Sequence, residues 1–487
     1  DPGNGEGFKY SDLVSYANAM DQLSGQEIEE NRFASFYGAL DYSLFDRYVL
    51  NVSFRTDGSN NFGSDEQFNP TWSAGAVWHV SEETFMEVVR PVLSRLSLRV
   101  ATGYTGNINK TVKPNLMMKY YKNFRISDDE NYRMGYINNA PNPKLRWEKT
   151  RDVKVALDFG LWKDRINGIV EAYWRKSKDC VTSEYVPVTT GFFNQSYNTS
   201  VLQNNGVEFS LSVAVLKSKD YNLSVSANVA WNQNKLKKYN SPNTSLALDK
   251  YVGYPMGAVF SGKYEGIDPE TGMYKFKLRP DAVTNKDGYL REPNNYYYYL
   301  GTSVAPFTGG FNLNFSYKNI GLSVGGSYSV KAKMVDNIES PAGYELLSGS
   351  KLESIPTPHN DLYRNHLNVK REVRNRWTPE NRTGVKYPRL IDAYGKKLGL
   401  DLTNPTLTTI TRGALLEDIS YLRINTIALS YSLPQRVLER INFSSAALNL
   451  TLNNFFTITK YSGIDPEVPG ATYPVSRSVT IGLNVGF

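Results

Sequence analysis

The feature that most constrains this chain is a strict alternation of apolar and polar side chains, repeated in many separate runs. The last ten residues show it most clearly, because apolar side chains at every odd position alternate with polar or small ones. A two-residue period is that of a β-strand with one apolar face. Similar runs occur at 72–80, 96–104, 153–161, 207–215, 221–231, 311–317 and 448–452. The sequence therefore predicts an all-β fold.

Soluble β-sandwiches also alternate, but two features favour a transmembrane barrel. Several runs reach about ten residues, the length that a tilted strand needs to cross a bilayer, whereas ordinary strands average about five or six. The polar positions are mostly Ser, Asn, Gly and Thr, which suits a wet lumen, and aromatic residues such as Trp78, Tyr104, Trp231 and Tyr461 lie near the run ends. With 13% aromatic and only 21% charged residues, the chain is not disordered.

The lengths of the connections support the same interpretation. Short turns alternate with long loops, an asymmetry typical of outer-membrane barrels, in which the long loops face outward. Two of the short connections, 81–92 and 434–442, are predicted to hold a helical turn, the second with Pro434 at its first position. The thirteen predicted strands are 33–43, 46–56, 71–80, 93–104, 151–161, 165–176, 205–216, 221–232, 310–318, 320–331, 420–433, 443–455 and 477–487.

An odd number of strands cannot close into an antiparallel barrel, and bacterial single-chain barrels usually have an even number. Unpaired backbone N–H and C=O groups at an open edge are also not viable in hydrocarbon. We therefore expect the two edge strands, 33–43 and 477–487, to pair with a segment outside this sequence. The thirteen strands would then form one part of a continuous barrel.

Several function classes are disfavoured by the sequence. The net charge of +7 is spread over 487 residues without a basic block, so nucleic-acid binding is not expected. The single cysteine, Cys180, excludes a disulfide framework, and the histidines at 79, 359 and 366 lack metal-ligand spacing. No nucleophile elbow, P-loop or dinucleotide motif is present. We expect neither an enzyme nor a cofactor, and we expect His79 to face the lumen or the membrane interface.

The sequence Gly-Ile-Asp-Pro-Glu occurs twice, at 266–270 and 463–467. Carboxylates suit Ca²⁺, so Asp268 with Glu270, or Asp465 with Glu467, could ligate this ion. The favoured interpretation is a turn in which proline fixes φ and the Asp side chain binds its own backbone. The run 128–130 (Asp-Asp-Glu) is likewise interpreted as a solvated loop face.

Longer motifs resemble the C-terminal part of the SusC/RagA family of TonB-dependent outer-membrane transporters. They include Phe54-Arg-Thr-Asp-Gly-Ser-Asn-Asn-Phe-Gly63, Pro141-Asn-Pro-Lys-Leu-Arg-Trp-Glu-Lys-Thr150, Asn205-Gly-Val-Glu208, Tyr264-Glu-Gly-Ile-Asp-Pro-Glu-Thr-Gly272, Arg376-Trp-Thr-Pro379 and the tail from Asn453 through Glu467 to Phe487. They span nearly the whole chain in the family's order. One departure is the pair Asn60-Asn61, where the family more often has Ser-containing pairs.

The resemblance implies that residues 1–487 are the C-terminal part of a 22-stranded transmembrane β-barrel with long extracellular loops. About nine strands, a plug and a TonB box would lie outside this sequence. It further implies the outer membrane of a Gram-negative bacterium, energy supplied through TonB, a SusD-like lipoprotein lid, a dimer of transporter–lid pairs, and oligosaccharide or oligopeptide substrates. The alternatives are a siderophore or cobalamin importer of the wider class and a passive porin or structural barrel.

Several individual residues have expected roles. Phe487 is the expected assembly signal, because outer-membrane barrels end in an aromatic residue. Val479, Ile481, Leu483 and Val485 are expected to point to lipid, and Thr480 and Asn484 to the lumen. The candidate loop or substrate-side residues, which could equally be turn or rim packing, are Arg55, Asp57, Trp147, Tyr296, Tyr297, Tyr298 and Tyr299.

Overall fold

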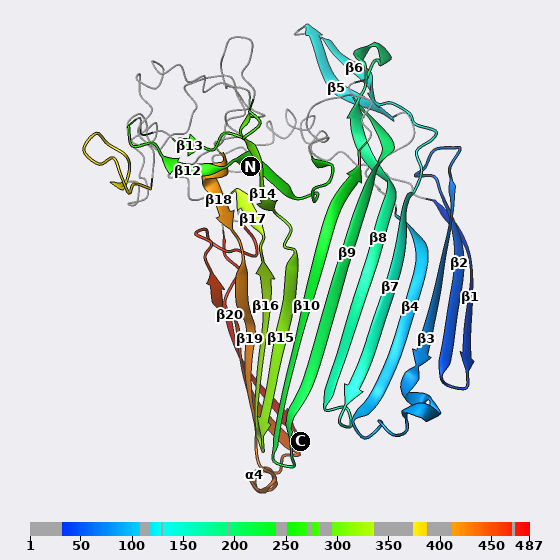
Figure 1. The fold of residues 1–487 in the computed structure, drawn as a ribbon, viewed down its shortest axis with the longest axis vertical. Coiled ribbons are helices and arrows are strands. Elements are labelled where there is room, and N and C mark those ends of the chain that lie inside the picture. The colour runs from blue at the N-terminus through cyan, green and yellow to red at the C-terminus, as the bar shows by residue number, and fades with distance from the viewer. Residues whose placement is uncertain are drawn as a thin grey trace.

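The fold is a single tall, curved sheet with long connections at one end, seen in the computed structural model (Figure 1). The structure describes residues 32–107, 117–127, 130–192, 194–239, 251–270, 272, 274–282, 295–335, 374–386, 412–469 and 473–487. Asp128, Asp129, His359 and His366 lie outside the described residues.

Thirteen antiparallel strands form the sheet, which confirms the predicted number and positions. Each strand of the sheet pairs with the next sheet strand along the chain. At three places a long connection with rim elements lies between the partners, where β4 pairs with β7, β10 with β15 and β16 with β19. In order across the sheet, the strands are β1 (Phe33–Leu44), β2 (Tyr48–Ser59), β3 (Phe68–His79), β4 (Leu93–Asn107), β7 (Glu148–Leu161), β8 (Ile166–Tyr185), β9 (Asn194–Lys217), β10 (Tyr221–Lys238), β15 (Phe307–Tyr317), β16 (Ile320–Val330), β19 (Tyr421–Ser432), β20 (Ser445–Thr459) and β21 (Ser478–Gly486).

The pairing register sorts the side chains onto two faces, because partners in an antiparallel ladder point to the same side. One row across the sheet is almost entirely apolar, and we call its side the apolar face: Tyr42, Leu50, Ala76, Val100, Val155, Ala172, Val207, Trp231, Phe307 and Val330. The next row defines the polar face: Asn51, Gly75, Ala101, Lys154, Tyr173, Gly206 and Asn232.

The last strand follows the predicted facing. Val479, Ile481 and Leu483 pair with Leu452, Leu450 and Leu448, so they lie on the apolar face, and Ile481 is 73% exposed. Thr480 and Asn484 lie on the opposite face. An exposed apolar strand of this kind is typical of a surface that meets a membrane or another protein.

Short turns lie at the lower end of the sheet in Figure 1, together with the C-terminus. The β1–β2 turn has Phe45 and Asp46 both at φ 53°, the left-handed conformation of tight hairpins. The two predicted helical turns are present as η1 (Val80–Glu82) with η2 (Thr84–Met86), and as α4 (Gln435–Arg440). Pro434 is the N-cap of α4 and not its first residue, which corrects the sequence prediction. No described helix is long and apolar enough to cross a membrane.

The opposite end is a rim of small elements built on the long connections. Strands β8, β9 and β10 extend into it well beyond their predicted ends. The rim elements are β5 (Met117–Ser127), β6 (Glu130–Asn139), η3 (Val188–Thr190), β11 (Ala258–Gly262), β12 (Tyr264–Ile267), β13 (Tyr274–Phe276), β14 (Tyr297–Thr302), β17 (Lys333–Val335), η9 (Arg412–Leu415) and β18 (Leu416–Asp418). Tyr297–Tyr299 therefore belong to a strand and not to an irregular loop.

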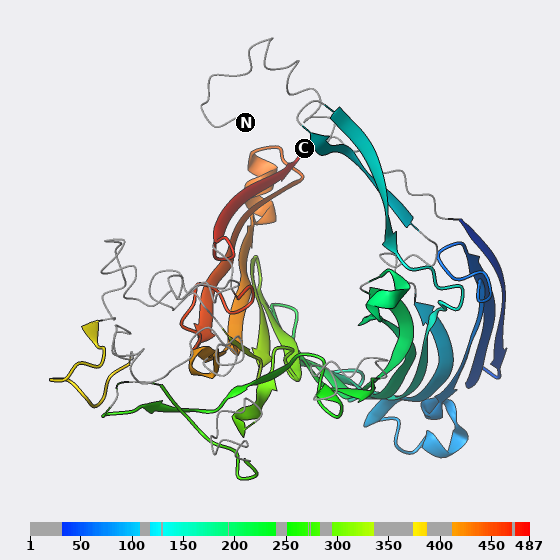
Figure 2. The ribbon, with the colours of Figure 1, turned by 90° about the horizontal axis from the view of Figure 1, so that it is seen from above.

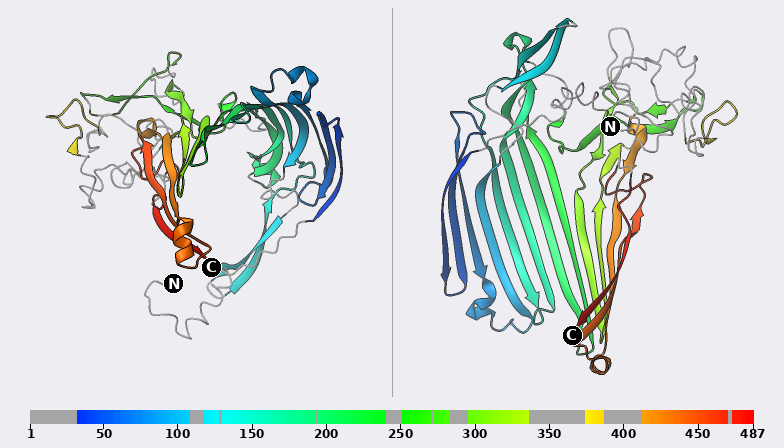
Figure 3. Two further views of the ribbon diagram at one scale, coloured as in Figure 1. Left: turned by 90° about the horizontal axis from the view of Figure 1, so that it is seen from below. Right: turned by 180° about the vertical axis from the view of Figure 1, so that it is seen from behind.

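Seen along its strands, the sheet is an open arc (Figures 2 and 3). β1 and β21 occupy the two ends of the strand order and do not pair with each other. The thirteen strands thus form a curved wall whose two edge strands are not joined to each other. That strands outside this sequence complete a barrel stays a prediction.

Candidate functional site

Three ion pairs cross the polar face between neighbouring strands. Arg99 on β4 contacts Asp158 on β7 at 2.6 Å, and Arg175 on β8 contacts Asp152 on β7 at 2.9 Å. Between them, Lys154 lies 3.2 Å from Glu171. The carboxylate side chains are about one-fifth exposed, whereas the basic ones are about two-fifths exposed. On the polar face the carboxylates are therefore held in ion pairs and mostly covered, whereas the basic groups remain accessible to solvent or to a ligand.

These ion pairs were not singled out from the sequence, although a signal was present. Asp152, Lys154 and Asp158 occupy alternate positions of β7 and interrupt an otherwise apolar run. A charged residue at every second position of a membrane strand marks its lumen side. His79 also lies on this polar face, where its Nδ1 is 3.0 Å from the hydroxyl of Ser97. That this side faces the lumen or the membrane interface stays a prediction.

Arg55 and Asp57 form one local cluster on the polar face of β2. Arg55 Nε lies 2.7 Å from an Asp57 carboxylate oxygen, which also accepts a 2.5 Å hydrogen bond from Ser35. The Arg55 side chain is 57% exposed and that of Asp57 is 15% exposed. The guanidinium is thus oriented by its neighbours while remaining accessible. A role in binding substrate stays a prediction.

Trp147, in contrast, is 5% exposed and packs inside the rim. Its ring stacks on Phe62 with a centroid separation of 4.4 Å. The two surrounding segments are joined by the backbone, since Gly63 N–H donates to the carbonyl of Leu145 at 2.9 Å. A Cβ on Gly63 would lie 1.8 Å from the carbonyl oxygen of Pro143, so only glycine allows this approach. The motifs 54–63 and 141–150 therefore dock on each other.

Arg146 connects the same cluster to the β8–β9 hairpin. It donates to the Asp179 carboxylate at 2.6 Å, and this hydrogen bond raises the pKa of Arg146. The Asn198 amide bridges the two sides, because it donates to the carbonyls of Arg146 and Asp179, each at 2.7 Å. We call Phe62, Leu145, Trp147 and the Arg146–Asp179 pair the N-side cluster.

A second cluster lies above β16, β19 and β20. Ala332, Ile419 and Tyr461 form a small apolar core against which Ala305 and Met334 pack. Beside it, Arg423 contacts Asp465 at 2.5 Å and Glu467 at 2.8 Å, and the Arg423 side chain is only 3% exposed. We call this the C-side cluster.

Asp465 is held by several donors at once. Its carboxylate accepts the backbone N–H groups of Glu467 at 3.0 Å and Val475 at 3.2 Å. Burial alone would raise the pKa of Asp465, but these hydrogen bonds and Arg423 outweigh it, so the pKa is lowered. The carboxylate is thus ionised and satisfied by protein groups.

Both Gly-Ile-Asp-Pro-Glu repeats adopt the predicted turn. Asp268 accepts the N–H of Glu270 at 2.8 Å, matching the Asp465–Glu467 bond of the second repeat. The first repeat is also fastened from outside, since Trp377 Nε1 donates to the carbonyl of Pro269 at 2.9 Å. Among the described residues, no group of three or more potential metal ligands comes together.

The four-tyrosine run contributes to an aromatic cluster at the small sheet formed by β11 and β14. Tyr299 is 41% exposed and packs against Tyr254 at 4.9 Å and Phe260 at 5.7 Å between ring centroids. Burial against these rings raises the pKa of Tyr299. Tyr298 donates its hydroxyl to the carbonyl of Leu278, whereas Tyr296 precedes the strand. Sequence reasoning missed Tyr254 and Phe260 because the loop connecting them to the run has no periodicity.

Comparison with known proteins agrees with this architecture. Residues 3–350 match the family model described as TonB dependent receptor-like, beta-barrel. The chain is 27% identical to TonB-dependent receptor SusC of Bacteroides thetaiotaomicron, covering 94% of this chain and 44% of that protein. It is 26% identical to TonB-dependent receptor P26 of Formosa agariphila, covering 94% and 46%.

Among solved structures, the chain is similar to the RagAB peptide transporter, with a TM-score of 0.75, 26% identity, and coverage of 94% of this chain and 48% of that one. The chain thus spans about half the length of the relatives it matches. The strand count, the two-faced wall and the family match lead to one conclusion: the chain belongs to the TonB-dependent receptor-like β-barrel family and resembles its SusC/RagA members.

Proposed function

We propose that this chain forms thirteen consecutive strands of a transporter barrel in the outer membrane of a Gram-negative bacterium. The observation that carries the proposal is the separation of the two faces: exposed apolar rows on one side, and ion pairs and small polar residues on the other. A wall of this kind suits hydrocarbon on its apolar face and a water-filled lumen on its polar face.

The full transporter contains about nine further strands, which close the sheet between β1 and β21, and a plug that fills the lumen. TonB pulls on this plug and supplies the energy. Residues 1–487 supply the C-terminal part of the barrel and its outward loops. The open edges of β1 and β21 support this arrangement, since exposed edges are costly in a bilayer.

The cargo is a large nutrient, an oligosaccharide or oligopeptide, delivered with the help of a SusD-like lipoprotein lid in a dimer of transporter–lid pairs. Arg55 and Asp57 on the polar face, and the tyrosines at 296–299 on the rim, are the proposed substrate-side residues. An accessible, oriented guanidinium suits carboxylates or hydroxyls, and aromatic rings suit the apolar faces of sugars or side chains. Trp147 supports the rim from inside.

The test is uptake by cells that carry the complete transporter, with TonB present or deleted. Labelled oligosaccharides and oligopeptides are offered separately, and proteins that copurify with the barrel are identified. TonB-dependent uptake together with a lipoprotein partner supports the proposal. Ion conductance without TonB supports a passive porin instead, and uptake restricted to iron chelates or cobalamin supports the wider class of importers.

A further inference from the structure

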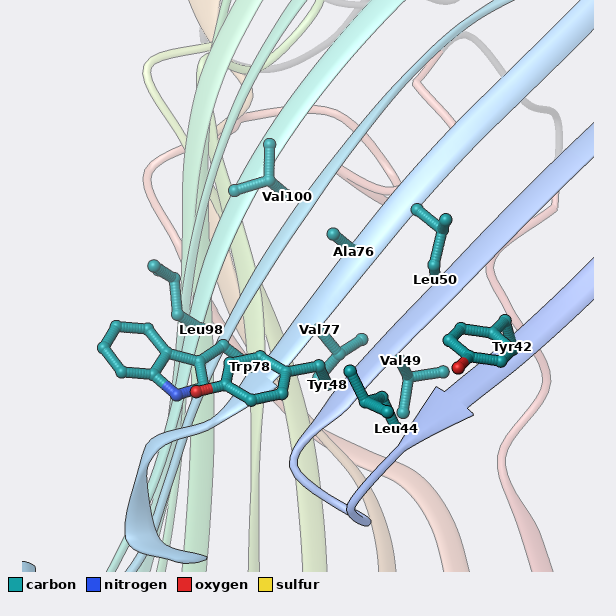
Figure 4. A pocket seen from close by; sticks show the side chains of 10 residues that line it. All are labelled: Tyr42, Leu44, Tyr48, Val49, Leu50, Ala76, Val77, Trp78, Leu98 and Val100. Atoms are coloured by element: carbon teal, nitrogen blue, oxygen red, sulfur yellow. The ribbon is translucent and has the colours of Figure 1, made fainter. Parts of the chain in front are cut away.

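The apolar face changes its composition toward the rim. Over the middle of the sheet it is apolar, and Figure 4 shows Leu50, Ala76 and Val100 side by side in one row, where they line a pocket. Two rows closer to the rim lie Trp72 and Tyr104, whose ring centroids are 5.9 Å apart. The row of Tyr104 continues onto β7 and β8 with basic residues. The apolar face therefore ends in aromatic and basic residues, as a membrane protein does at the level of the lipid headgroups.

Four basic side chains form two directly opposed pairs at this level. Arg151 on β7 is the ladder partner of Lys176 on β8, and Lys149 is the partner of Lys178. The members of each strand are two positions apart, so all four side chains point to the apolar side. Their Cβ atoms are spaced by about 5 Å across the strands and about 7 Å along them. We call these four residues the basic patch.

The basic patch has no carboxylate partner among the residues that the structure describes. None of its four members forms an ion pair there, whereas Lys154 and Arg175, on the polar face of the same two strands, are each paired with a carboxylate. Along the row of Arg151 and Lys176, the flanking residues are the uncharged Tyr104 and Gln203. Like charges directly opposite each other destabilise a sheet. The patch is therefore suited to an anion supplied by another molecule.

The surroundings of the patch favour an anion that belongs to a lipid. Arg151, Lys176 and Lys178 are exposed. One step toward the middle of the sheet, the same face carries the ladder partners Val153 and Trp174, and Trp174 is 50% exposed. An anion at the patch therefore adjoins an aromatic ring and the apolar rows beyond it. A phosphate joined to acyl chains contacts both the charges and these rows, whereas a free phosphate or a protein resting on the rim contacts only the charges.

We propose that the basic patch binds the phosphate of a lipid in the outer leaflet of the membrane, with the acyl chains lying over Val153 and Ala172. The inference rests on the proposed function, which places the apolar face in the outer membrane with the rim outward. The leaflet follows from position. From Ile166 to Trp174, β8 has about nine residues, the length of a membrane-crossing strand, and the patch begins directly after them on the rim side.

The test measures the affinity of the complete transporter, in uncharged detergent, for lipid A, a phosphorylated glycolipid of outer membranes. Native mass spectrometry counts the bound lipid at increasing lipid concentration. The double variant Arg151→Gln with Lys176→Gln lowers the affinity roughly thirtyfold, because each cation near an anionic headgroup contributes about fivefold. Dephosphorylated lipid A binds the wild type and the double variant with the same, lower affinity.

Lys217→Gln with Lys219→Gln is the matched control, because it removes the same net charge from two exposed lysines at the β9–β10 turn, at the opposite end of the sheet. It leaves the affinity for lipid A unchanged. Lys176→Arg keeps the charge and retains the wild-type affinity. Migration in gels before and after heating verifies that each variant is folded. If the double variant does not fold, Lys176→Gln alone replaces it, with an expected loss of about fivefold.

Three results overturn the inference: equal affinity of the wild type for lipid A and its dephosphorylated form, an equal effect of the two double variants, or displacement of the lipid by inorganic phosphate at constant ionic strength. Failure of the proposed function is seen separately. A folded transporter that is absent from the outer-membrane fraction overturns both, whereas one that resides there and imports nothing in the presence of TonB contradicts the transport function alone.

Discussion

The wall and the rim of this molecule bury their side chains in opposite ways. Along the wall, large apolar side chains such as Ile481 and Leu483 are more than 60% exposed, and the hydrogen-bonded ladder connects the strands. In the rim, Phe62, Trp147 and Tyr461 are each at most 6% exposed. The rim is therefore organised like a small water-soluble protein, whereas the wall depends on the membrane for its apolar environment.

Within the rim, the N-side and C-side clusters hold the long loops in place by different interactions. The N-side cluster relies on an aromatic stack and a close glycine contact, with the Arg146–Asp179 pair still partly exposed. The C-side cluster buries its ion pair, since the side chains of Arg423 and Asp465 are 3% and 7% exposed. Because water does not stabilise these two buried charges, removing one of them leaves the other buried without a compensating charge.

The largest effect is expected for Arg423→Ala. This change leaves Asp465 buried without its cation and should cost about 3–5 kcal/mol in the local stability of the C-side cluster. Hydrogen exchange of residues 461–469 measures the loss. The double variant Arg423→Met with Asp465→Asn is the control, because it removes both charges and should recover part of the protection. Unchanged exchange in Arg423→Ala would show that the ion pair does not hold this loop.

The next largest effect concerns the wall. Leu483→Arg places a charge on the apolar face and should cost roughly 2–4 kcal/mol if the position lies near the bilayer midplane. Asn484→Arg, its neighbour on the polar face, should be nearly neutral. Folding titrations into lipid vesicles compare the two variants. Equal costs would contradict the assignment of the two faces.

This contrast explains how much of the structure the sequence could predict. The thirteen strands could be predicted from the alternation of apolar and polar residues, because each residue in the sheet only has to place its side chain on the correct face. The rim did not follow, because Trp147 and Phe62, or Trp377 and Pro269, meet through contacts between distant loops that no local period encodes. Motif resemblance pointed to these residues, but only the structure places Trp147 in packing while Arg55 remains accessible.

Removing the last residue, Phe487, is expected to have a smaller effect on the stability of the folded protein. The Phe487 ring is 91% exposed and its ring contact is an edge-to-face one with Phe443 at 5.0 Å. Its burial can contribute at most about 2–3 kcal/mol. We propose that the residue acts in assembly, so deleting Phe487 should nevertheless strongly reduce the amount of heat-modifiable barrel in the outer membrane. Phe443→Ala removes the same ring contact and serves as control. Normal barrel levels after the deletion would argue against an assembly signal.

A still smaller effect is expected for Arg146→Ala. The side chains of Arg146 and Asp179 are 38% and 27% exposed, so solvent screens their attraction and the loss should be about 0–1 kcal/mol. The rate at which a protease cleaves residues 141–147 measures this loss of local stability. A loss as large as that of Arg423→Ala would remove the distinction between the two clusters.

The smallest change is expected on lowering the pH from 7 to 5, where the C-side cluster should keep its protection. Asp465 has a lowered pKa in the folded rim, so its ionised form stabilises the cluster above the ordinary carboxyl value of about 4. As the pH falls through the lower folded value, the carboxylate takes up a proton, its bond to Arg423 weakens and that stability is lost. Proteolysis of residues 461–469 between pH 7 and 3 should therefore accelerate only below about pH 4. In Asp465→Asn the group cannot titrate, so this acid step should disappear; if it persists, another carboxyl group controls the opening.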